Sequence, residues 1–204
     1  MASPVKFALL ALVLFSAEQA LAQEAGRRGF IGLGIGPSTP VGSFAQQASW
    51  ANPRTAGTTS GYTDTFVNLG YRFRKHLGVA AALSYSEYVM PGNGEDDWWQ
   101  VANFTVGPMY SLRLGDDRAA LDLKAMFGLM TMTPVVDGFS SDDATGSGLG
   151  VDLRAAVRYD VLRRWALFAE VGLQSSNVSF PTYGTRTDYR ALISGFGVAF
   201  RPAW

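Results

Sequence analysis

The sequence predicts an all-β protein: an eight-stranded antiparallel up-and-down barrel that spans a membrane with its strands and is preceded by a cleavable signal peptide. Three observations carry this prediction. Apolar residues alternate with small or polar residues along most of the chain. The connections between these stretches alternate between short and long. The chain also begins with an export signal. Period-two alternation places successive side chains on opposite faces of a strand.

The first segment has the features of a secretory signal. Lys6 supplies the positive charge, "FALLALVLF" the apolar core, and Ala20-Leu21-Ala22 the small-x-small cleavage site. The apolar run is too short to cross a bilayer as a helix, for which about 20 residues are needed. We therefore expect residues 1–22 to be a Sec-type signal peptide and residues 23–204 to form one barrel domain.

Composition narrows the classes of partner and cofactor. Charged residues make up 17% of the chain, against about 25% in an ordinary soluble domain. The formal net charge is zero, which gives no reason to expect a nucleic acid partner. There is no cysteine, so disulfides and thiolate metal sites are excluded. We expect no cofactor.

Alternation is clearest in "GVDLRAAVRYDV", where Val151, Leu153 and Val157 share one face and Asp152 and Arg154 share the other. Comparable stretches recur along the chain and are mostly long enough for a tilted bilayer-spanning strand of about 9–11 residues. The eight predicted strands cover residues 29–36, 62–74, 77–89, 98–114, 119–132, 148–161, 165–179 and 188–201.

The connections alternate in length. Those at 75–76, 115–118 and 162–164 are short, whereas 37–61, 90–97, 133–147 and 180–187 are longer and rich in Gly, Pro, Ser, Thr and Asp, as loops are. Short turns at one end and long loops at the other are typical of outer-membrane barrels, whose short turns face the periplasm.

The alternation leaves open which face points outward. The second set of residues is dominated by Gly, Ala, Ser, Asn and Met, which suits the filling of a narrow barrel better than a soluble surface. The aliphatic set carries no formal charge in mid-strand, and aromatic residues gather at its ends, as at bilayer interfaces. We therefore expect the aliphatic set to face lipid; the alternative is a soluble, lipocalin-like barrel. The aromatic residues are Tyr71, Phe73, Tyr85, Trp98, Tyr110, Tyr159 and Trp165.

The inward face carries charges of both signs. Because an unpaired charge is costly to bury, we expect Glu170, Asp152 and Asp122 to bridge the basic residues in a polar network. This network would pack the interior and fix strand register; a narrow path for a small solute is the alternative. The residues expected in it are Arg72, Asp122, Lys124, Asp152, Arg154, Arg158, Glu170 and Arg201.

Three stretches resemble a known family: "GFIGLGIGPSTPVGSF", "LGYRFRKHLGVAAALSYS" and the closing "SGFGVAFRPAW". With the strand pattern they are similar to small eight-stranded outer-membrane barrels of OmpA/OmpX type, the outer membrane β-barrel domain family. The resemblance implies an integral outer-membrane monomer that contacts lipid and lipopolysaccharide and is inserted by the barrel-assembly machinery. It also implies a C-terminal assembly signal, here matched by Phe196, Val198, Phe200 and Trp204, with Pro202 interrupting the alternation.

The resemblance leaves several roles open. Members of such families include adhesins, anchors, small-solute pores and, less closely, lipid A-modifying enzymes. The enzymes use a histidine near the outer leaflet, whereas His76 lies in a predicted periplasmic turn. We therefore expect no enzyme activity and no metal site, and a structural or surface-interaction role that resembles that of an adhesin.

Two further features of the sequence, the aromatic residues of the first long loop and a proline within a strand, also lead to predictions. Phe44 and Trp50 in the long loop 37–61 either form a surface for an extracellular ligand or lie over the barrel mouth. Pro108 falls inside a predicted strand and cannot donate a ladder hydrogen bond, so we expect a bulge or local break near it.

Overall fold

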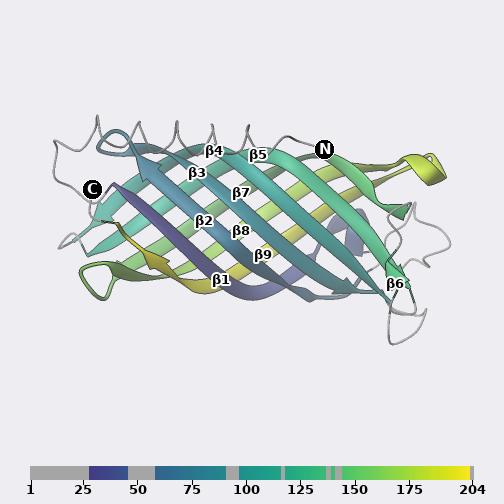
Figure 1. Ribbon diagram of the computed structural model, residues 1–204, viewed down its shortest axis with the longest axis horizontal. Coiled ribbons are helices and arrows are strands. Elements are labelled where there is room, and N and C mark those ends of the chain that lie inside the picture. The colour runs from purple at the N-terminus through teal and green to yellow at the C-terminus, as the bar shows by residue number, and fades with distance from the viewer. Residues whose placement is uncertain are drawn as a thin grey trace, which may run out of the picture.

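The molecule is a barrel of β-strands that close into a ring (Figure 1). This computed structural model describes residues 28–45, 58–90, 97–115, 118–136, 139–140 and 144–202. The predicted signal peptide, residues 1–22, lies outside these residues. Each long strand pairs antiparallel with its neighbour in sequence, and the first pairs with the last, giving eight antiparallel strands in a ring, as predicted.

The elements follow one another up and down the barrel wall. A two-residue strand, β6, extends the end of β5, so the long strands are β1–β5 and β7–β9. The bounds are β1 Gly29–Pro40, η1 Gly42–Ala45, β2 Gly61–Arg72, β3 Leu77–Val89, β4 Trp98–Leu114, β5 Ala119–Val136, β6 Phe139–Ser140, β7 Gly146–Asp160, β8 Trp165–Phe180, η3 Pro181–Tyr183 and β9 Thr185–Phe200.

Several predicted boundaries were too short at the long-loop side. β1 continues to Pro40, β5 continues to Val136, and β9 begins at Thr185. The sequence predicts loops here because these stretches are rich in Gly, Pro, Ser and Thr. In the structure, their residues instead pair with a neighbouring strand. The barrel therefore extends past the membrane-spanning length that the alternation of apolar residues marks.

The first and last strands close the ring. β1 pairs with β9 from Ile31↔Phe200 to Pro40↔Ala191. A Cβ atom on Gly36 would collide with the backbone carbonyl oxygen of Ser194. Glycine in this first strand permits a close backbone approach at the seam.

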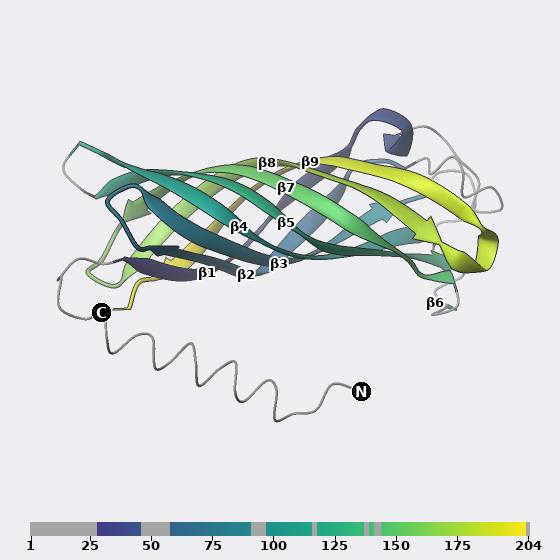
Figure 2. The same ribbon diagram turned by 90° about the horizontal axis from the view of Figure 1, so that it is seen from above.

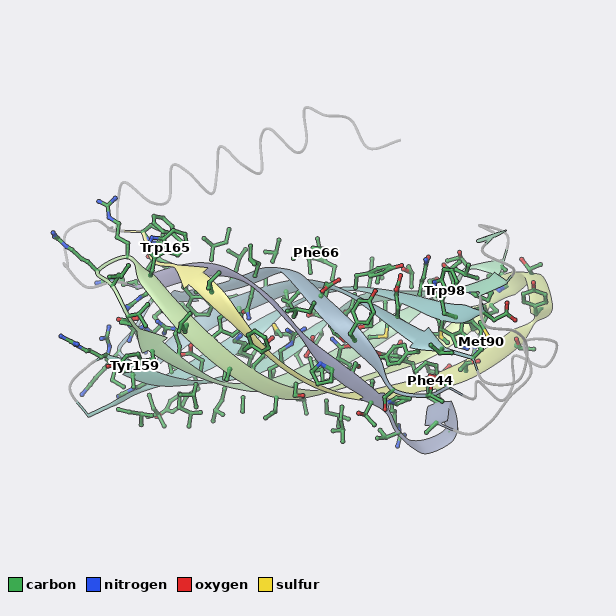
Figure 3. The ribbon with its side chains drawn as sticks, turned by 90° about the horizontal axis from the view of Figure 1, so that it is seen from below. Phe44, Phe66, Met90, Trp98, Tyr159 and Trp165 are labelled. Atoms are coloured by element: carbon green, nitrogen blue, oxygen red, sulfur yellow. The ribbon has the colours of Figure 1, made fainter. Side chains whose placement is uncertain are left out.

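The aliphatic face points outward. On β7, Val151, Leu153 and Val157 are 37%, 44% and 50% exposed, whereas the alternate residues Asp152 and Arg154 are 0% and 3% exposed. A lipocalin-like barrel would bury the first set and expose the second, so that alternative is wrong. Figure 3 shows aromatic side chains at both ends of this face, among them Tyr159 and Trp165 at one end and Trp98 at the other.

β2 contains a bulge that the alternation did not reveal. Thr65 pairs with Ser84 of β3 and Val67 pairs with Leu83, so Phe66 is one extra residue. Phe66 is 58% exposed on the outer face. An extra residue reverses the alternation beyond it, so the outward residues are even-numbered before Phe66 and odd-numbered after it.

The expectation at Pro108 is confirmed as a local break. The β4–β5 ladder pairs Val106 with Phe127 and resumes at Met109 with Lys124, without a change of register. The β3–β4 ladder is continuous through Val79↔Pro108. The missing N–H of proline therefore affects only the side that faces β5.

The two ends of the barrel differ (Figure 2). We call one the short-turn end; it holds the turns at residues 73–76 and 161–164, Gly115 and Arg118, the start of β1 and the end of β9. The other, the long-loop end, holds η1, β6 and η3. In the described residues, no helix has the length and apolar character needed to cross a membrane.

The exposed aliphatic face makes a testable prediction. We expect Leu153→Arg to lower the free energy of unfolding by about 2–4 kcal/mol, because arginine on a mid-bilayer lipid-facing site is costly. Leu162→Arg, in a turn where the leucine is 65% exposed, is the matched control and should change stability little. Denaturant unfolding in phospholipid vesicles measures both; equal effects would show that Leu153 does not face lipid.

Candidate functional site

Buried apolar side chains close the barrel interior at the long-loop end. We call this group the outer cluster; nearly all its members come from inward positions of the strands, and one, Phe44, comes from η1. Its aromatic and methionine side chains are large and almost completely buried. The members are Phe44, Tyr88, Met90, Trp99, Val101, Met130, Met132, Val178, Phe180, Tyr189 and Ala191.

Phe44 covers the barrel mouth. Its side chain is 0% exposed, and its ring meets Tyr88 and Tyr189 edge-on, with centroid distances of 5.2 and 4.9 Å. Of the two alternatives for Phe44, the second is therefore confirmed: its ring is buried over the barrel mouth. Trp50 lies outside the described residues.

A chain of hydrogen bonds runs inward from this cluster. The hydroxyl oxygens of Ser38 and Tyr88 lie 2.6 Å apart, and those of Tyr88 and Tyr189 2.8 Å apart. Tyr189 donates to Gln174 Oε1 at 3.1 Å, and Gln174 Nε2 donates to Asp152 Oδ2 at 3.1 Å. The polar ends of the buried tyrosines are thus connected to the charges in the middle of the barrel, so their hydroxyls are not left without partners.

The middle of the barrel holds a central network of opposite charges. Arg154 Nη2 lies 2.7 Å from Asp152 Oδ2, and Arg154 Nη1 lies 2.8 Å from Glu170 Oε1. Lys124 Nζ lies 3.5 Å from Glu170 Oε2 and donates to Asn68 Oδ1 at 2.8 Å. These side chains are buried, and each charge has an opposite partner, which offsets its loss of hydration.

A second apolar group, the inner cluster, lies nearer the short-turn end. The ring of Phe30 is close to two cations: Lys124 Nζ lies 5.6 Å and Arg158 Cζ lies 4.7 Å from its centroid. Phe30 thus lies between the central network and a second ion pair, that of Arg158 Nε with Asp122 Oδ2 at 3.1 Å. The members are Phe30, Ala80, Ala82, Met109, Met126, Ala166, Phe168 and Ala199.

The predicted inward charges divide into separate groups. Lys124, Arg154, Asp152 and Glu170 meet in one network, whereas Arg158 pairs with Asp122 apart from it. The ring of Phe30 lies close to Arg158, 4.7 Å from its Cζ atom. Arg201 pairs with Asp160 near the short-turn end, and Arg72 is half-buried there, 3.5 Å from the carbonyl oxygen of Lys75.

Sequence reasoning missed several residues of the network. Asp160, Asn68 and Gln174 have inward parity on their strands but do not belong to the network that the sequence predicts. Asn68 donates to Glu170 at 3.1 Å although 102 positions separate them. The parity of each residue was visible in the sequence, but no local pattern identifies partners across the barrel.

The residues of the expected assembly signal lie on or near the outer face. Phe196 and Val198 are 68% and 39% exposed, and Phe200 packs edge-on against Trp165 at a centroid distance of 5.4 Å. Trp204 lies outside the described residues. Recognition of this segment by assembly machinery stays a prediction.

His76 lies at the short-turn end, in the turn between β2 and β3. Its Nδ1 atom is 3.0 Å from the carbonyl oxygen of Ser111, and its ring lies 5.6 Å from that of Tyr110. In the described ranges, no three His, Asp or Glu side chains gather as metal ligands would. Several acidic residues of the long loops lie outside those ranges: Glu95, Asp96, Asp137, Asp142 and Asp143.

Comparison with known proteins decides the family. The family model described as outer membrane protein beta-barrel domain matches residues 7–201, most of the chain. The chain belongs to the outer membrane protein β-barrel domain family. The expected location, the outer membrane, is thereby confirmed. Among curated proteins, none matches this sequence.

The fold is similar to that of one solved structure, and two others align at lower scores. The structure of Neisserial surface protein A aligns with a TM-score of 0.63 at 15% identity, covering 88% of this chain and 100% of that chain. Ail of Yersinia pestis aligns with a TM-score of 0.47 at 14% identity, covering 86% and 99%. OprG from Pseudomonas aeruginosa aligns with a TM-score of 0.42 at 14% identity, covering 89% and 99%.

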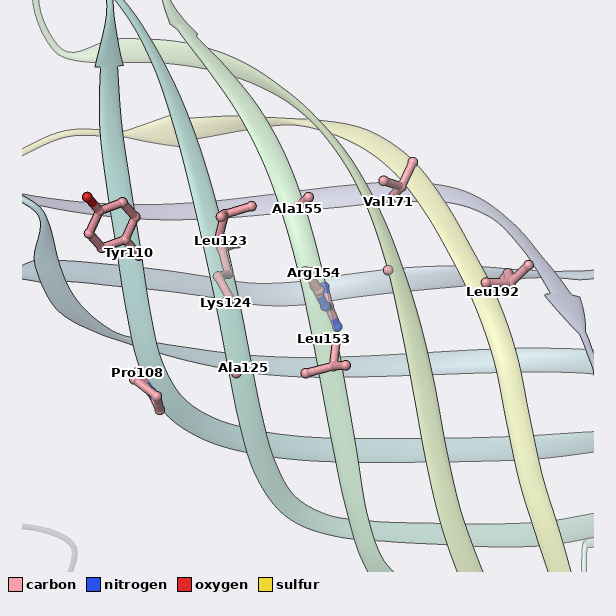
Figure 4. Close-up of a pocket in the computed structure, with 11 residues that line it drawn as sticks. Pro108, Tyr110, Leu123, Lys124, Ala125, Leu153, Arg154, Ala155, Val171 and Leu192 are labelled. Carbon is pink, nitrogen blue, oxygen red and sulfur yellow. The ribbon is translucent and has the colours of Figure 1, made fainter.

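The family gives the ends of the barrel their location. Short turns of outer-membrane barrels face the periplasm and long loops face outward, so the short-turn end of this outer membrane protein is periplasmic and the long-loop end external. The aliphatic face then lies against acyl chains. Figure 4 shows a depression on this face, where the small side chains of Ala125 and Ala155 lie among Leu123, Leu153 and Val171.

The central network makes a testable prediction. We expect Arg154→Met to lower the free energy of unfolding by about 3–5 kcal/mol, because Asp152 loses its ion pair and Glu170 keeps only Lys124. The exposed turn residue Arg163, changed to Met, is the matched control and should stay within about 0.5 kcal/mol of wild type. Denaturant unfolding in vesicles compares them; a wild-type-like Arg154→Met barrel would show that the network does not stabilise the fold.

Proposed function

We propose that this outer membrane protein is a non-conducting, membrane-anchored surface protein whose external loops carry an adhesin-like or structural role. The observation that carries the proposal is the filling of the interior. The outer cluster, the central network and the inner cluster occupy successive parts of the barrel, and their large side chains are almost fully buried.

A filled interior supports a role on the surface because it leaves the external loops as the part that meets partners. An eight-stranded barrel is just wide enough to be filled by side chains. Phe44 adds a ring from η1 over the mouth, held against Tyr88 and Tyr189. The long-loop end is then the rim of a rigid wall, an arrangement in which binding loops commonly occur.

A narrow channel is the second candidate, because charged side chains lie inside the barrel. Lys124, Arg154 and Glu170 would suit the wall of a polar path. The ion pairs within the network, at 2.7–3.5 Å, argue against a path, because each charge is already engaged by its neighbour. The apolar clusters on either side would also exclude water and ions.

Electrical recording tests this proposal. We expect the purified mature protein in a planar bilayer to give no reproducible stepwise conductance, because apolar side chains fill the interior on both sides of the central network. A general porin inserted under the same conditions is the positive control. Stable openings of one size, seen in independent preparations, would favour the narrow channel and reject the closed interior.

We also propose that the protein is not a lipid A-modifying enzyme. The position of His76 supports this, because its turn is periplasmic and its Nδ1 atom is engaged at Ser111. We expect mass spectra of lipid A from cells with and without the expressed protein to be identical. A new acylated or deacylated lipid A species that depends on expression would contradict this proposal.

A further inference from the structure

Charge is distributed unevenly along the barrel axis, although the formal net charge of the chain is zero. Among the described residues, the periplasmic, short-turn end holds ten arginine and lysine residues and two acidic ones, and Figure 3 shows nitrogen-bearing side chains projecting at this end. Asp116 and Asp117, which precede Arg118 in the sequence, bring the acidic residues there only to four. The ten are Arg28, Arg72, Arg74, Lys75, Arg113, Arg118, Arg158, Arg163, Arg164 and Arg201, and the two are Asp122 and Asp160.

Three of these arginines point toward the barrel axis at the periplasmic opening, not toward lipid. Arg72 has the inward parity that β2 keeps beyond its bulge. Arg113 shares a face of β4 with the buried Ser111, and Arg158 is 5% exposed on the inward face of β7. Arg113 and Arg158 pair with Ala120 of β5 from opposite sides, so their Cα atoms are about 10 Å apart.

A fourth arginine completes a group that we call the periplasmic arginine cluster: Arg28, Arg72, Arg113 and Arg158. The carbonyl oxygen of Arg28 accepts a hydrogen bond of 2.8 Å from the backbone nitrogen of Arg72. The other three guanidinium groups repel that of Arg72, whereas the carboxylate of Asp122 attracts it. Asp122 is also the ion-pair partner of Arg158, at 3.1 Å. The excess of positive charge around the opening therefore favours an anionic partner.

The placement of these charges favours an extended acidic peptide over other anions. Lipid headgroups surround the outside of the wall, whereas the cluster points toward the axis. A single small anion cannot contact both the cluster and the exposed basic residues of the turns around it. An extended peptide rises about 3.3 Å per residue, so a few residues span the distance from Arg113 to Arg158 and reach the turns as well. The exposed turn residues are Arg74, Lys75, Arg118, Arg163 and Arg164.

We propose that the periplasmic opening of the barrel binds an acidic segment of a periplasmic polypeptide, whose carboxylates pair with the periplasmic arginine cluster and with the basic turns around it. Guanidinium groups bind carboxylates through parallel N–H donors, which fixes geometry as well as charge. The ring of Phe30 lies 4.7 Å from Arg158 Cζ, so the segment lies across the opening and does not thread the barrel. This docking surface is at the end opposite the external loops and does not depend on the proposed surface role.

Fluorescence anisotropy tests the docking surface, with the mature barrel in nanodiscs of phosphatidylcholine, a lipid without net charge. The probe is a fluorescein-labelled peptide of about ten aspartates, long enough to span the opening. We expect it to bind wild type and to bind more weakly as salt rises. R72Q/R113Q should bind it about 25-fold more weakly, from about fivefold for each ion pair lost. R72K/R113K keeps the charge and should lose less than about fivefold.

Matched variants separate the inward arginines from general attraction to a basic surface. R163Q/R164Q removes the same charge from an exposed turn and should weaken peptide binding at most about threefold. Binding of phosphatidylglycerol, counted by native mass spectrometry, should be equal in wild type and R72Q/R113Q. Heat-modified mobility on gels verifies that each variant is folded. The proposal would be overturned if the peptide did not bind wild type, if R72Q/R113Q kept wild-type affinity, or if R163Q/R164Q lost as much. Loss of phosphatidylglycerol from R72Q/R113Q would identify lipid headgroups as the occupant and would also overturn it.

Discussion

The need to satisfy every backbone polar group inside a bilayer determines the rest of this structure. Hydrocarbon offers no hydrogen-bonding partner, so a sheet that crosses it must close on itself. Closure requires β1 to pair with β9, which brings the backbone of Gly36 against that of Ser194. It also divides every strand into a face toward lipid and a face toward an enclosed space.

The enclosed space then sets the chemistry of the interior. Inward charges have no bulk water to hydrate them, so they occur in pairs, as Arg154 does with Asp152 and Glu170. Large apolar side chains fill the remaining volume on both sides of these pairs. The side chains that pack the barrel also occupy its interior, and this filling is the basis of the proposed surface role.

Much of this arrangement follows from the sequence because period-two alternation depends only on local geometry. Parity places Leu153 and Asp152 on opposite faces, and the small and polar composition of the second set predicts that Leu153 faces outward. The face of Phe66 could not be assigned in this way, because a bulge shifts the alternation by one residue. Phe66 and Val67 are adjacent and both apolar, so the sequence does not reveal where the shift occurs. Phe44 lies outside any alternating strand, and its burial depends on contacts with Tyr88 and Tyr189 from distant parts of the chain.

Site-directed spin labelling along β7 tests the orientation of the wall most directly, because the chain has no native cysteine. Single cysteines from 149 to 157 would be labelled in lipid vesicles, and the collision rates of each label with oxygen and with a water-soluble nickel complex would be measured. The account predicts a period of two, with oxygen collisions high at residues 149, 151, 153, 155 and 157 and low at those between them. Oxygen collisions without that period, or highest at residues 152 and 154, would contradict it.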